Sequence, residues 1–388
     1  MKSTSCITAI KAWRVSVPLL EEWAASPEMG GHLNGGHRLI LRLEDGEGTS
    51  GWGEGATGLS FEAIEAVLKR LPGTPLASLR MQMLELHPEP TYFHKPPGNS
   101  PYSPDHARLK HRLRHPLQAV VEMAALDLLA RRARVPLNVL MGGAWRDRVP
   151  TDYWMGRTTP GMAKQCVERG KALGFRGIKL KTTLEDPNIE RMEAILEAGG
   201  PDWHVTVDPN GRFYRLDDAL PTILEMDALG NMGILEDPFP RFHLDEFVAV
   251  RRRLKNARLV LHIDPPEILH QVVAARAAGG LNIDSHTQGL TAWRLQAGIA
   301  DQFNLPVWHG SGLDLGIATA AQLHIASATP NCQLPGDQVG PWLREASLVK
   351  TPFTVEDGHV LVPGDGDGIG VAPDEDAFER YTSKTWEL

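Results

Sequence analysis

Three acidic residues stand at equal intervals in the middle of the chain, and each closes a short apolar run. Asp208 follows His-Val-Thr-Val, Glu236 follows Gly-Ile-Leu and Asp264 follows Leu-Val-Leu-His-Ile, with 28 residues from one acid to the next. A strand, a helix and two short loops together take roughly 25 to 35 residues. The spacing therefore predicts consecutive units of a closed parallel (β/α) barrel, in which the three acids meet at the carboxyl-end mouth.

Three carboxylates at one mouth repel one another, and a divalent cation relieves that repulsion. A site made of oxygen ligands alone suits Mg2+, with Mn2+ as the alternative, better than Zn2+. A competing interpretation makes each acid a solvated loop residue or helix N-cap, because Asp-Pro and Glu-Asp-Pro commonly open turns. The equal spacing of all three acids favours the metal site.

The second half of the chain alternates short apolar runs with helical segments. Eight such runs occur, the number that a closed barrel needs: 149–155, 177–181, 205–208, 234–237, 259–264, 281–286, 307–309 and 332–335. Before them, the patterns predict strands at 7–20 and 37–54 and a helix over 117–134. Between those two strands, the Gly-rich stretch 21–36 is long for a hairpin and predicts a binding loop.

Composition limits the class of protein. The 388 residues with 42% hydrophobic content are enough for a large core and about two domains. A net charge of −8, with both signs spread along the chain, argues against a nucleic-acid partner. The three cysteines have neither metal-type nor CxxC spacing, and no apolar run approaches the length of a membrane span. We therefore expect a cytoplasmic protein with reduced thiols and no membrane partner.

Two lysines close the second run, in Ile178-Lys179-Leu180-Lys181. Residues two apart in a strand share a face, and a barrel interior is costly for two ammonium groups unless they meet anions at the mouth. Crowding between them would lower the pKa of one lysine, and a neutral amine is a base. The alternative places both lysines outward on a strand edge.

The sixth and seventh runs carry a second set of candidates. Asn282, Asp284 and His286 share one face of the sixth run, and His309 closes the seventh. A carboxylate beside a histidine fixes its tautomer and supports its cation, which makes an acid/base pair. The sequence leaves open which of these three residues lies opposite His309. Asp284 is preferred on chemical grounds. Asp337, just after the eighth run, could donate a hydrogen bond to substrate oxygens if protonated.

In combination, these motifs resemble the enolase superfamily, and within it the mandelate racemase and muconate lactonizing enzyme family. The resemblance covers nearly the whole chain and rests on Gly51-Trp-Gly-Glu-Gly, Ala124-Ala-Leu-Asp-Leu, Leu140-Met-Gly-Gly, Lys179-x-Lys181, Asp208-Pro-Asn, Glu236-Asp-Pro and Asp264. It implies an α/β fold, a (β/α)7β TIM-like barrel with an α+β N-terminal capping domain. The expected division is a cap over 1–135, a barrel over 136–353 and a C-terminal segment, 354–388, that returns to the cap.

The resemblance also implies a chemistry. Asp208, Glu236 and Asp264 would hold Mg2+, Lys181 would be a base with Lys179 beside it, and Asp284 and His309 would serve the opposite face. The implied reaction removes the proton α to a substrate carboxylate through a metal-stabilised enediolate. We expect dehydration of a hydroxylated acid such as a sugar acid. The alternatives are a racemase, epimerase or cycloisomerase of a small carboxylate, or a barrel that binds without turnover. Family barrels of this type often form even-numbered homo-oligomers.

The sequence departs from the family at three points. Muconate-type members carry a lysine on the sixth strand, and this chain has no lysine between Lys255 and Lys350. Asp264 is followed by Pro-Pro-Glu, which makes Glu267 a candidate substitute ligand. Some sugar-acid dehydratases have a histidine where Asn210 stands, so the acid that expels hydroxide here would be His309 or another group.

Overall fold

The computed structural model describes residues 6–20, 36–56, 58, 60–76, 116–264, 266–286, 288–310, 312–364 and 366–388. Residues 21–35 of the predicted binding loop lie outside them. The strands are β1 Ile7–Val15, β2 Arg38–Asp45, β3 Ser50–Ala56, β4 Arg148–Pro150, β5 Tyr153–Met155, β6 Gly177–Lys181, β7 His204–Asp208, β8 Met232–Glu236, β9 Arg258–His262, β10 Gly280–Ile283, β11 Val307–His309, β12 Val355–Glu356, β13 His359–Leu361 and β14 Thr382–Glu387.

The α-helices are α3 Phe61–Leu68, α6 Pro116–Ala133, α7 Leu137–Leu140, α8 Pro160–Ala172, α9 Asn188–Gly199, α10 Leu216–Ala228, α11 Leu244–Arg251, α12 Leu269–Ala275, α13 Gly289–Gln302, α14 Gly316–Ser327, α15 Gly340–Leu343 and α16 Glu375–Tyr381. A 3-10 turn, η2 Pro266–Ile268, precedes α12. None of the described helices is long and apolar enough to cross a membrane.

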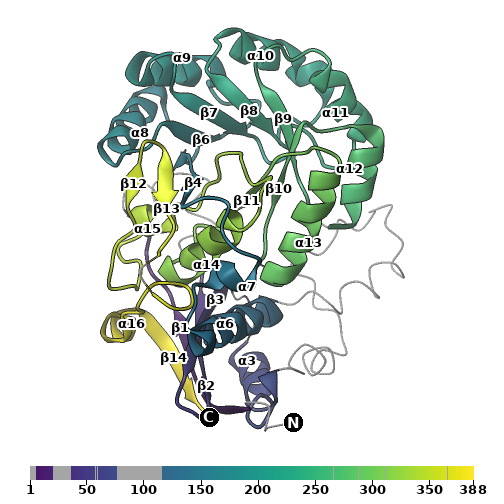
Figure 1. Cartoon of the computed structure of the whole chain (residues 1–388). Helices are drawn as coiled ribbons and strands as arrows, with labels where there is room; N and C mark the ends of the chain where they lie inside the picture. Colours follow the sequence, from purple (N-terminus) through teal and green to yellow (C-terminus); the bar gives the residue numbers. More distant parts are fainter. Residues whose placement is uncertain are drawn as a thin grey trace.

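Seven parallel strands form the barrel sheet in the order β11-β10-β9-β8-β7-β6-β5, with α8 to α13 on its outside (Figure 1). The eighth predicted run, 332–335, forms bridges in place of a strand. Cys332 pairs with Val307 of β11, and Gly336 pairs with Thr151 beside β5. Pro335 lacks the N–H that a continuous ladder needs, which accounts for the short contact. The segment nevertheless joins the two ends of the sheet, and the predicted (β/α)7β barrel is confirmed.

Side chains alternate between the two faces of the barrel strands. Leu180, Val207 and Leu235 belong to the large apolar core between the sheet and its helices. The residues next to the helix-facing ones along each strand point into the barrel. There, Ile234, Val260 and Trp308 form a small separate cluster. This alternation sets which polar residues near the strand ends reach the mouth.

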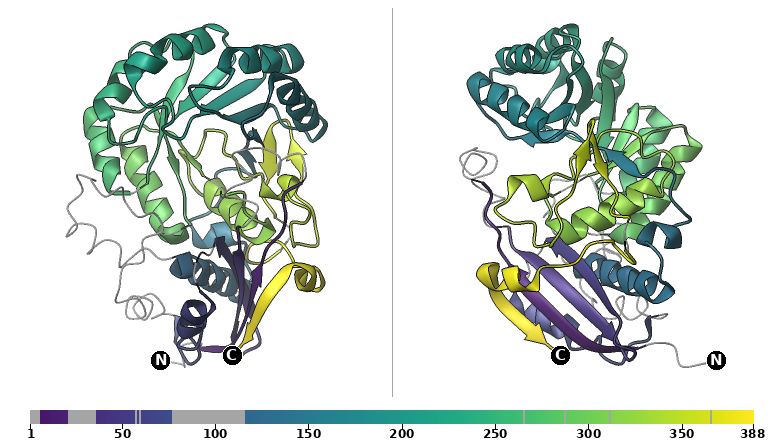
Figure 2. Two further views of the ribbon diagram at one scale, coloured as in Figure 1. Left: turned by 180° about the vertical axis from the view of Figure 1, so that it is seen from behind. Right: turned by 60° about the vertical axis from the view of Figure 1, so that its left-hand side comes forward.

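The cap is built on an antiparallel sheet in the order β14-β1-β2-β3, with α6 packed against β3 (Figure 2). Strand and helix approach so closely that two glycines are required. A Cβ on Gly51 would lie 2.2 Å from the Ala124 carbonyl oxygen, and one on Gly53 would lie 2.1 Å from the Val120 carbonyl oxygen. The glycines of the Gly-Trp-Gly-Glu motif therefore serve packing.

The C-terminal segment runs back along the cap. β14 pairs with β1, with Lys11 opposite Glu387, and Phe378 of α16 packs edge-on against Trp13 at 5.1 Å. β12 and β13 form a small sheet with β4 at the start of the barrel. The C-terminal segment thus contacts both the cap and the start of the barrel, and the division of the chain at 135/136 and 353/354 stays a prediction.

Two buried acids join the cap to the barrel. Glu54 of β3 accepts hydrogen bonds from the backbone N–H groups of Leu315 at 2.6 Å and Ala318 at 2.9 Å, at the start of α14. Arg38 of β2 forms an ion pair at 2.8 Å with Asp314. Burial, followed by the nearby Asp314, raises the pKa of Glu54 to about 7. The cap thereby fixes the loop that follows β11.

Candidate active site

Lys179 lies at the centre of a buried acidic cluster inside the barrel. Its Nζ is 2.8 Å from Glu236, 3.2 Å from Asp208 and 3.2 Å from Asp337. The ring of Trp308 lies 5.7 Å from the same ammonium group. Burial alone would lower the pKa of Lys179, but the three carboxylates together raise it well above its usual value. Lys179 is therefore a fixed cation.

Lys181 lies two residues further along β6, on the same face and closer to the mouth. Its side chain is 16% exposed. Its Nζ is 2.5 Å from Asp208 Oδ2 and 2.8 Å from Asn210 Oδ1. Asn210 has a positive φ of 49°, a conformation that asparagine tolerates well, and its N–H donates to Asp208. Burial would raise the pKa of Asp208, but Lys181 and Lys179 hold it far below its usual value.

Two of the three predicted metal ligands converge. Asp208 and Glu236 end adjacent strands, both are fully buried, and both reach Lys179. Burial and then the neighbouring Asp208 raise the pKa of Glu236 to about 7, a sign of crowded negative charge. Asp264 differs, because it lies two residues beyond β9 and its side chain is 41% exposed, with Oδ2 3.6 Å from Arg241.

Arg241 connects the loops after β8 and β9. It donates to Asp237 at 2.7 Å and to the Asp264 carbonyl oxygen at 3.2 Å, and it lies 3.1 Å from His262 Nδ1. Among the described residues, Glu236, Asp237 and His262 could hold a metal ion, since each offers one atom within 4.8 Å of the others. Asp237 and His262 are already bonded to Arg241, so we regard this trio as a satisfied network.

The charges around the mouth fit a hard cation. Five carboxylates contact three cationic side chains, a formal excess of two negative charges: Asp208, Glu236, Asp237, Asp264 and Asp337 against Lys179, Lys181 and Arg241. Oxygen donors with this excess match a divalent ion such as Mg2+. Asp208 and Glu236 fit that ion as they stand, whereas Asp264 would have to turn away from Arg241. Glu267, the alternative ligand, lies in η2.

The expected pair of Asp284 and His309 is wrong. His309 lies on the helix-facing side of β11, fully buried, where it stacks on Trp293 of α13 at 5.2 Å. Its Nε2 is 3.0 Å from Ser285 Oγ, and its Nδ1 is 2.6 Å from the Gly310 carbonyl oxygen. The physical reason is alternation, because Trp308 points inward and its neighbour must point outward. Burial, followed by the charge of His286, lowers the pKa of His309 to about 4.

Asp284 bonds to two other histidines. Its Oδ2 is 3.0 Å from His262 Nε2, and its Oδ1 is 3.3 Å from His286 Nδ1. On its other side, His286 Nε2 is 2.9 Å from Asp314 Oδ2. Burial opposes charge on Asp284, but His262 and His286 hold its pKa well below the usual range. Asn282, the third candidate partner of His309, donates to Glu236 at 2.6 Å.

Sequence reasoning missed His262, Arg241 and Asp314. His262 was detectable, because it stands two residues before Asp264 and so shares its face in an extended run. Arg241 and Asp314 lie in loops after β8 and β11, and no periodicity in the sequence marks where their side chains point.

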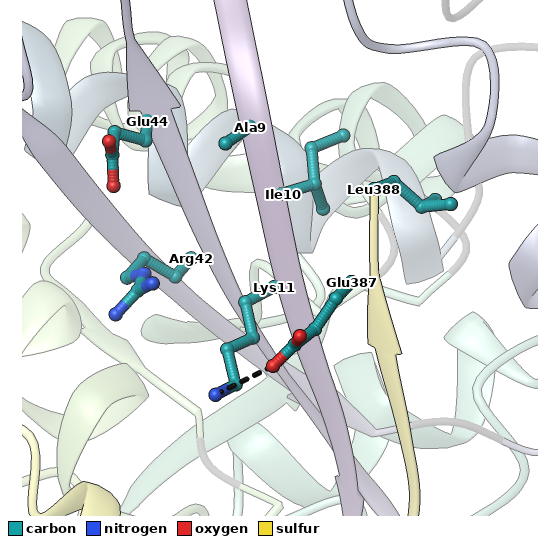
Figure 3. A pocket seen from close by; sticks show the side chains of 7 residues that line it. All are labelled: Ala9, Ile10, Lys11, Arg42, Glu44, Glu387 and Leu388. Carbon is teal, nitrogen blue, oxygen red and sulfur yellow. Dashed lines mark ion pairs between the residues drawn. The ribbon is translucent and has the colours of Figure 1, made fainter.

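A hollow of about 390 Å³ lies elsewhere, on the cap sheet (Figure 3). It is lined by Ala9, Ile10, Lys11, Arg42, Glu44, Glu387 and Leu388. Lys11 and Glu387 form an ion pair there at 2.9 Å, with 30% and 68% of their side chains exposed. Arg42 pairs with Glu375 outside the lining, and none of the lining residues is a predicted site residue.

Residues 161–377, more than half of the chain, match the family model described as enolase C-terminal domain-like. The chain belongs to the enolase superfamily, in the mandelate racemase and muconate lactonizing enzyme family. A chloromuconate cycloisomerase of Cupriavidus pinatubonensis is 27% identical over 364 residues, which cover 88% of this chain and 90% of the relative. An N-succinylamino acid racemase of Amycolatopsis is 29% identical and covers 69% of this chain and 72% of the relative.

Solved structures of this family share the fold. The N-succinyl Arg/Lys racemase of Bacillus cereus has a TM-score of 0.80 at 18% identity, covering 99% of this chain and 100% of its own. The 2-chloromuconate cycloisomerase of Rhodococcus opacus has a TM-score of 0.78 at 20% identity, covering 98% of this chain and 100% of its own. The expected family is confirmed, and the chain is an enzyme of this superfamily.

Proposed function

We propose that this enzyme removes the proton α to the carboxylate of a small-molecule substrate, with Lys181 as the base. The observation that carries the proposal is the arrangement of the two lysines around Asp208. Lys179 is buried and fixed as a cation, whereas Lys181 reaches the partly exposed mouth. Both amines contact Asp208, Lys179 at 3.2 Å and Lys181 at 2.5 Å, so Lys181 is the amine that a substrate entering the mouth would meet first.

The residues present fit Mg2+, with Mn2+ as the alternative. Asp208 and Glu236 would hold the ion, and Asp264 would complete the set from the end of β9. When bound, such an ion stabilises the negative charge that develops on carboxylate oxygens. Lys179 adds fixed positive charge from the barrel interior, and preorganised charge of this kind is commonly the largest catalytic contribution.

We propose dehydration of a hydroxylated acid, such as a sugar acid, as the overall reaction. Across the mouth, Asp284 lies between His262 and His286, and His286 is also bonded to Asp314. A histidine between two carboxylates holds its proton as a cation, so it acts as an acid more readily than as a base. Expulsion of a β-hydroxyl needs an acid on this face, whereas a racemase needs a group that also accepts protons.

Racemisation or cycloisomerisation is the second candidate, because relatives named as racemases and cycloisomerases align with most of the chain. The two readings differ in product. Elimination yields a 2-keto acid that reacts with semicarbazide, whereas racemisation changes optical rotation without forming a keto acid.

The base is tested with Lys181→Ala. Sugar acids, 2-hydroxy acids and N-succinylamino acids are incubated with Mg2+ in D2O, and exchange of the α-proton is read by mass spectrometry. We expect exchange by the native enzyme and a loss of at least ~10²-fold in the variant, the usual contribution of a positioned base. Lys255→Ala, at an exposed surface lysine, is the matched control. Exchange that persists in Lys181→Ala would refute the assignment.

A further inference from the structure

We propose that His286, oriented by Asp314, is the proton donor on the substrate face opposite Lys181. The inference rests on the proposed function and names a residue that the expected Asp284 and His309 pair does not supply. Four observations carry it: the place of His286 in the barrel, its bonding, the support of Asp314 and the seclusion of His309.

The barrel order places His286 across the mouth from Lys181. β6 and β10 lie four positions apart in a ring of seven strands closed by 332–336. In a ring of eight positions, elements four apart face each other across the axis. Lys181 ends β6, and His286 follows β10 on the inward side, three residues past its end.

The two ring nitrogens of His286 differ in their contacts. Nε2 lies 2.9 Å from Asp314 Oδ2, a normal charge-assisted hydrogen bond. Nδ1 lies 3.3 Å from Asp284 Oδ1, longer than such a bond usually is, and that oxygen also accepts the backbone N–H of His286. Nδ1 is thus held less tightly than Nε2, and 20% of the His286 side chain is exposed.

Asp314 is built to hold this imidazole. Its side chain is fully buried, Oδ1 is paired with Arg38 of the cap at 2.8 Å, and Oδ2 accepts from Gln322 of α14 at 2.8 Å. A carboxylate fixed from two other elements orients Nε2 and leaves Nδ1 to transfer the proton, the division of labour found in catalytic acid/base pairs. Asp314 is thus a positioning residue.

The other candidates are occupied or secluded. His309 has no exposed surface and bonds through both ring nitrogens to Ser285 and Gly310. His262 donates to Asp284 through Nε2, because Arg241 donates to its Nδ1. Neither ring offers a free donor to the mouth.

The proposed step balances as an elimination. Lys181 takes the α-proton, and the electron pair of that C–H bond forms the Cα–Cβ double bond. The Cβ–O bond breaks with its own electron pair, and His286 Nδ1–H protonates the departing hydroxyl to give water. Because the substrate carries a 2-hydroxyl, the product is an enol, which becomes a 2-keto acid by losing its O–H proton and gaining one at Cβ. Lys181 releases the α-proton to solvent. His286 is left neutral and regains a proton from solvent.

The test measures the ratio of product formed to α-proton exchanged, with the sugar-acid and hydroxy-acid set, Mg2+ and D2O. His286→Gln should keep Lys181-dependent exchange while the ratio falls at least ~10²-fold, the contribution of a positioned acid. Because the ratio is normalised to exchange, partial unfolding does not imitate the effect. His309→Gln should leave the ratio unchanged.

Asp314→Asn gives a second readout that a merely structural role would not move. The groups around His286 are Asp284, Asp314, His262, His309 and Arg38. Removing the negative charge of Asp314 should move the alkaline fall of the ratio to lower pH, because the donor loses its proton earlier.

The outcomes separate the two proposals. A native enzyme that neither exchanges an α-proton nor forms a 2-keto acid from any of these acids overturns the proposed function, and this inference with it. Exchange with an unchanged ratio in His286→Gln overturns the inference alone. A ratio lost in His309→Gln and kept in His286→Gln would return the donor role to His309.

Discussion

At the scale of the single residue, strand alternation decides which side chains share the mouth. Lys179 and Lys181 point inward because Leu180 between them packs against the helices. The same rule sends Trp308 inward and His309 outward, where burial holds the histidine neutral. His309 therefore stabilises the junction between β11 and α13.

The pH dependence of stability follows from this burial. The pKa of His309 is about 4 in the folded protein, below its ordinary value of 6.5, so unfolding takes up a proton between these pH values. Its contribution is present above pH 6.5 and is lost as the pH falls toward 4. Relative to His309→Gln, the native protein should lose about 2 kcal/mol between pH 7.5 and pH 5. Urea unfolding of both proteins at the two pH values measures this difference. An equal loss of unfolding free energy in the native protein and in His309→Gln would contradict it.

At the scale of the element, close approach decides what the cap sheet tolerates. β3 lies against α6 with room for hydrogen alone at Gly51 and Gly53. Trp52 between them faces the other way and stacks on Trp13 at 5.7 Å. Glu54, after Gly53, bonds to the start of α14. The Gly51-Trp-Gly-Glu motif thus lets one strand pack closely against a helix, form an aromatic pair and bond to the barrel.

Gly51→Ala should destabilise the protein by about 3 kcal/mol, because the new methyl group would overlap the backbone of α6. Gly46→Ala is the matched control. Gly46 lies in the turn after β2, where a Cβ would meet only a Thr8 methyl group at 3.6 Å. Thermal unfolding monitored by circular dichroism compares the two, and similar midpoints for both variants would count against the packing argument.

The elements themselves were largely predictable. The predicted runs 177–181 and 307–309 coincide with β6 and β11, and the helical pattern over 117–134 nearly coincides with α6, because apolar runs and helical periods are local properties. The side of the strand to which His309 points was not predictable. A run of three residues is too short to show which of its positions face the barrel interior. The link from Asp314 to His286 depends on a loop held by Arg38 of β2, far away in the sequence, and no local pattern reports such a contact.

At the scale of the whole molecule, negative charge is concentrated at the barrel mouth. The barrel mouth carries two more negative groups than positive ones, and these groups come from several strands and loops of the barrel. A ligand that neutralises this excess binds the folded state alone, because the carboxylates are dispersed in the unfolded chain.

Mg2+ should therefore raise the melting temperature of the native protein, by an amount equivalent to about 2.7 kcal/mol at a hundredfold excess over its dissociation constant. Asp208→Asn should remove this effect. His262→Gln should retain it, because Asp208 and Glu236 remain. Differential scanning fluorimetry with and without Mg2+ makes the comparison, and a response lost in His262→Gln but kept in Asp208→Asn would identify Glu236, Asp237 and His262 as the ligands.

The pairing of β14 with β1 bears on how the protein is made. The first strand of the cap is synthesised early, yet its sheet partner, Thr382–Glu387, leaves the ribosome after the entire barrel. A nascent chain must therefore hold β1 with one edge unpaired until residues 382–387 have been synthesised. A ribosome that stalls before residue 382 releases a barrel whose cap sheet lacks an outer strand.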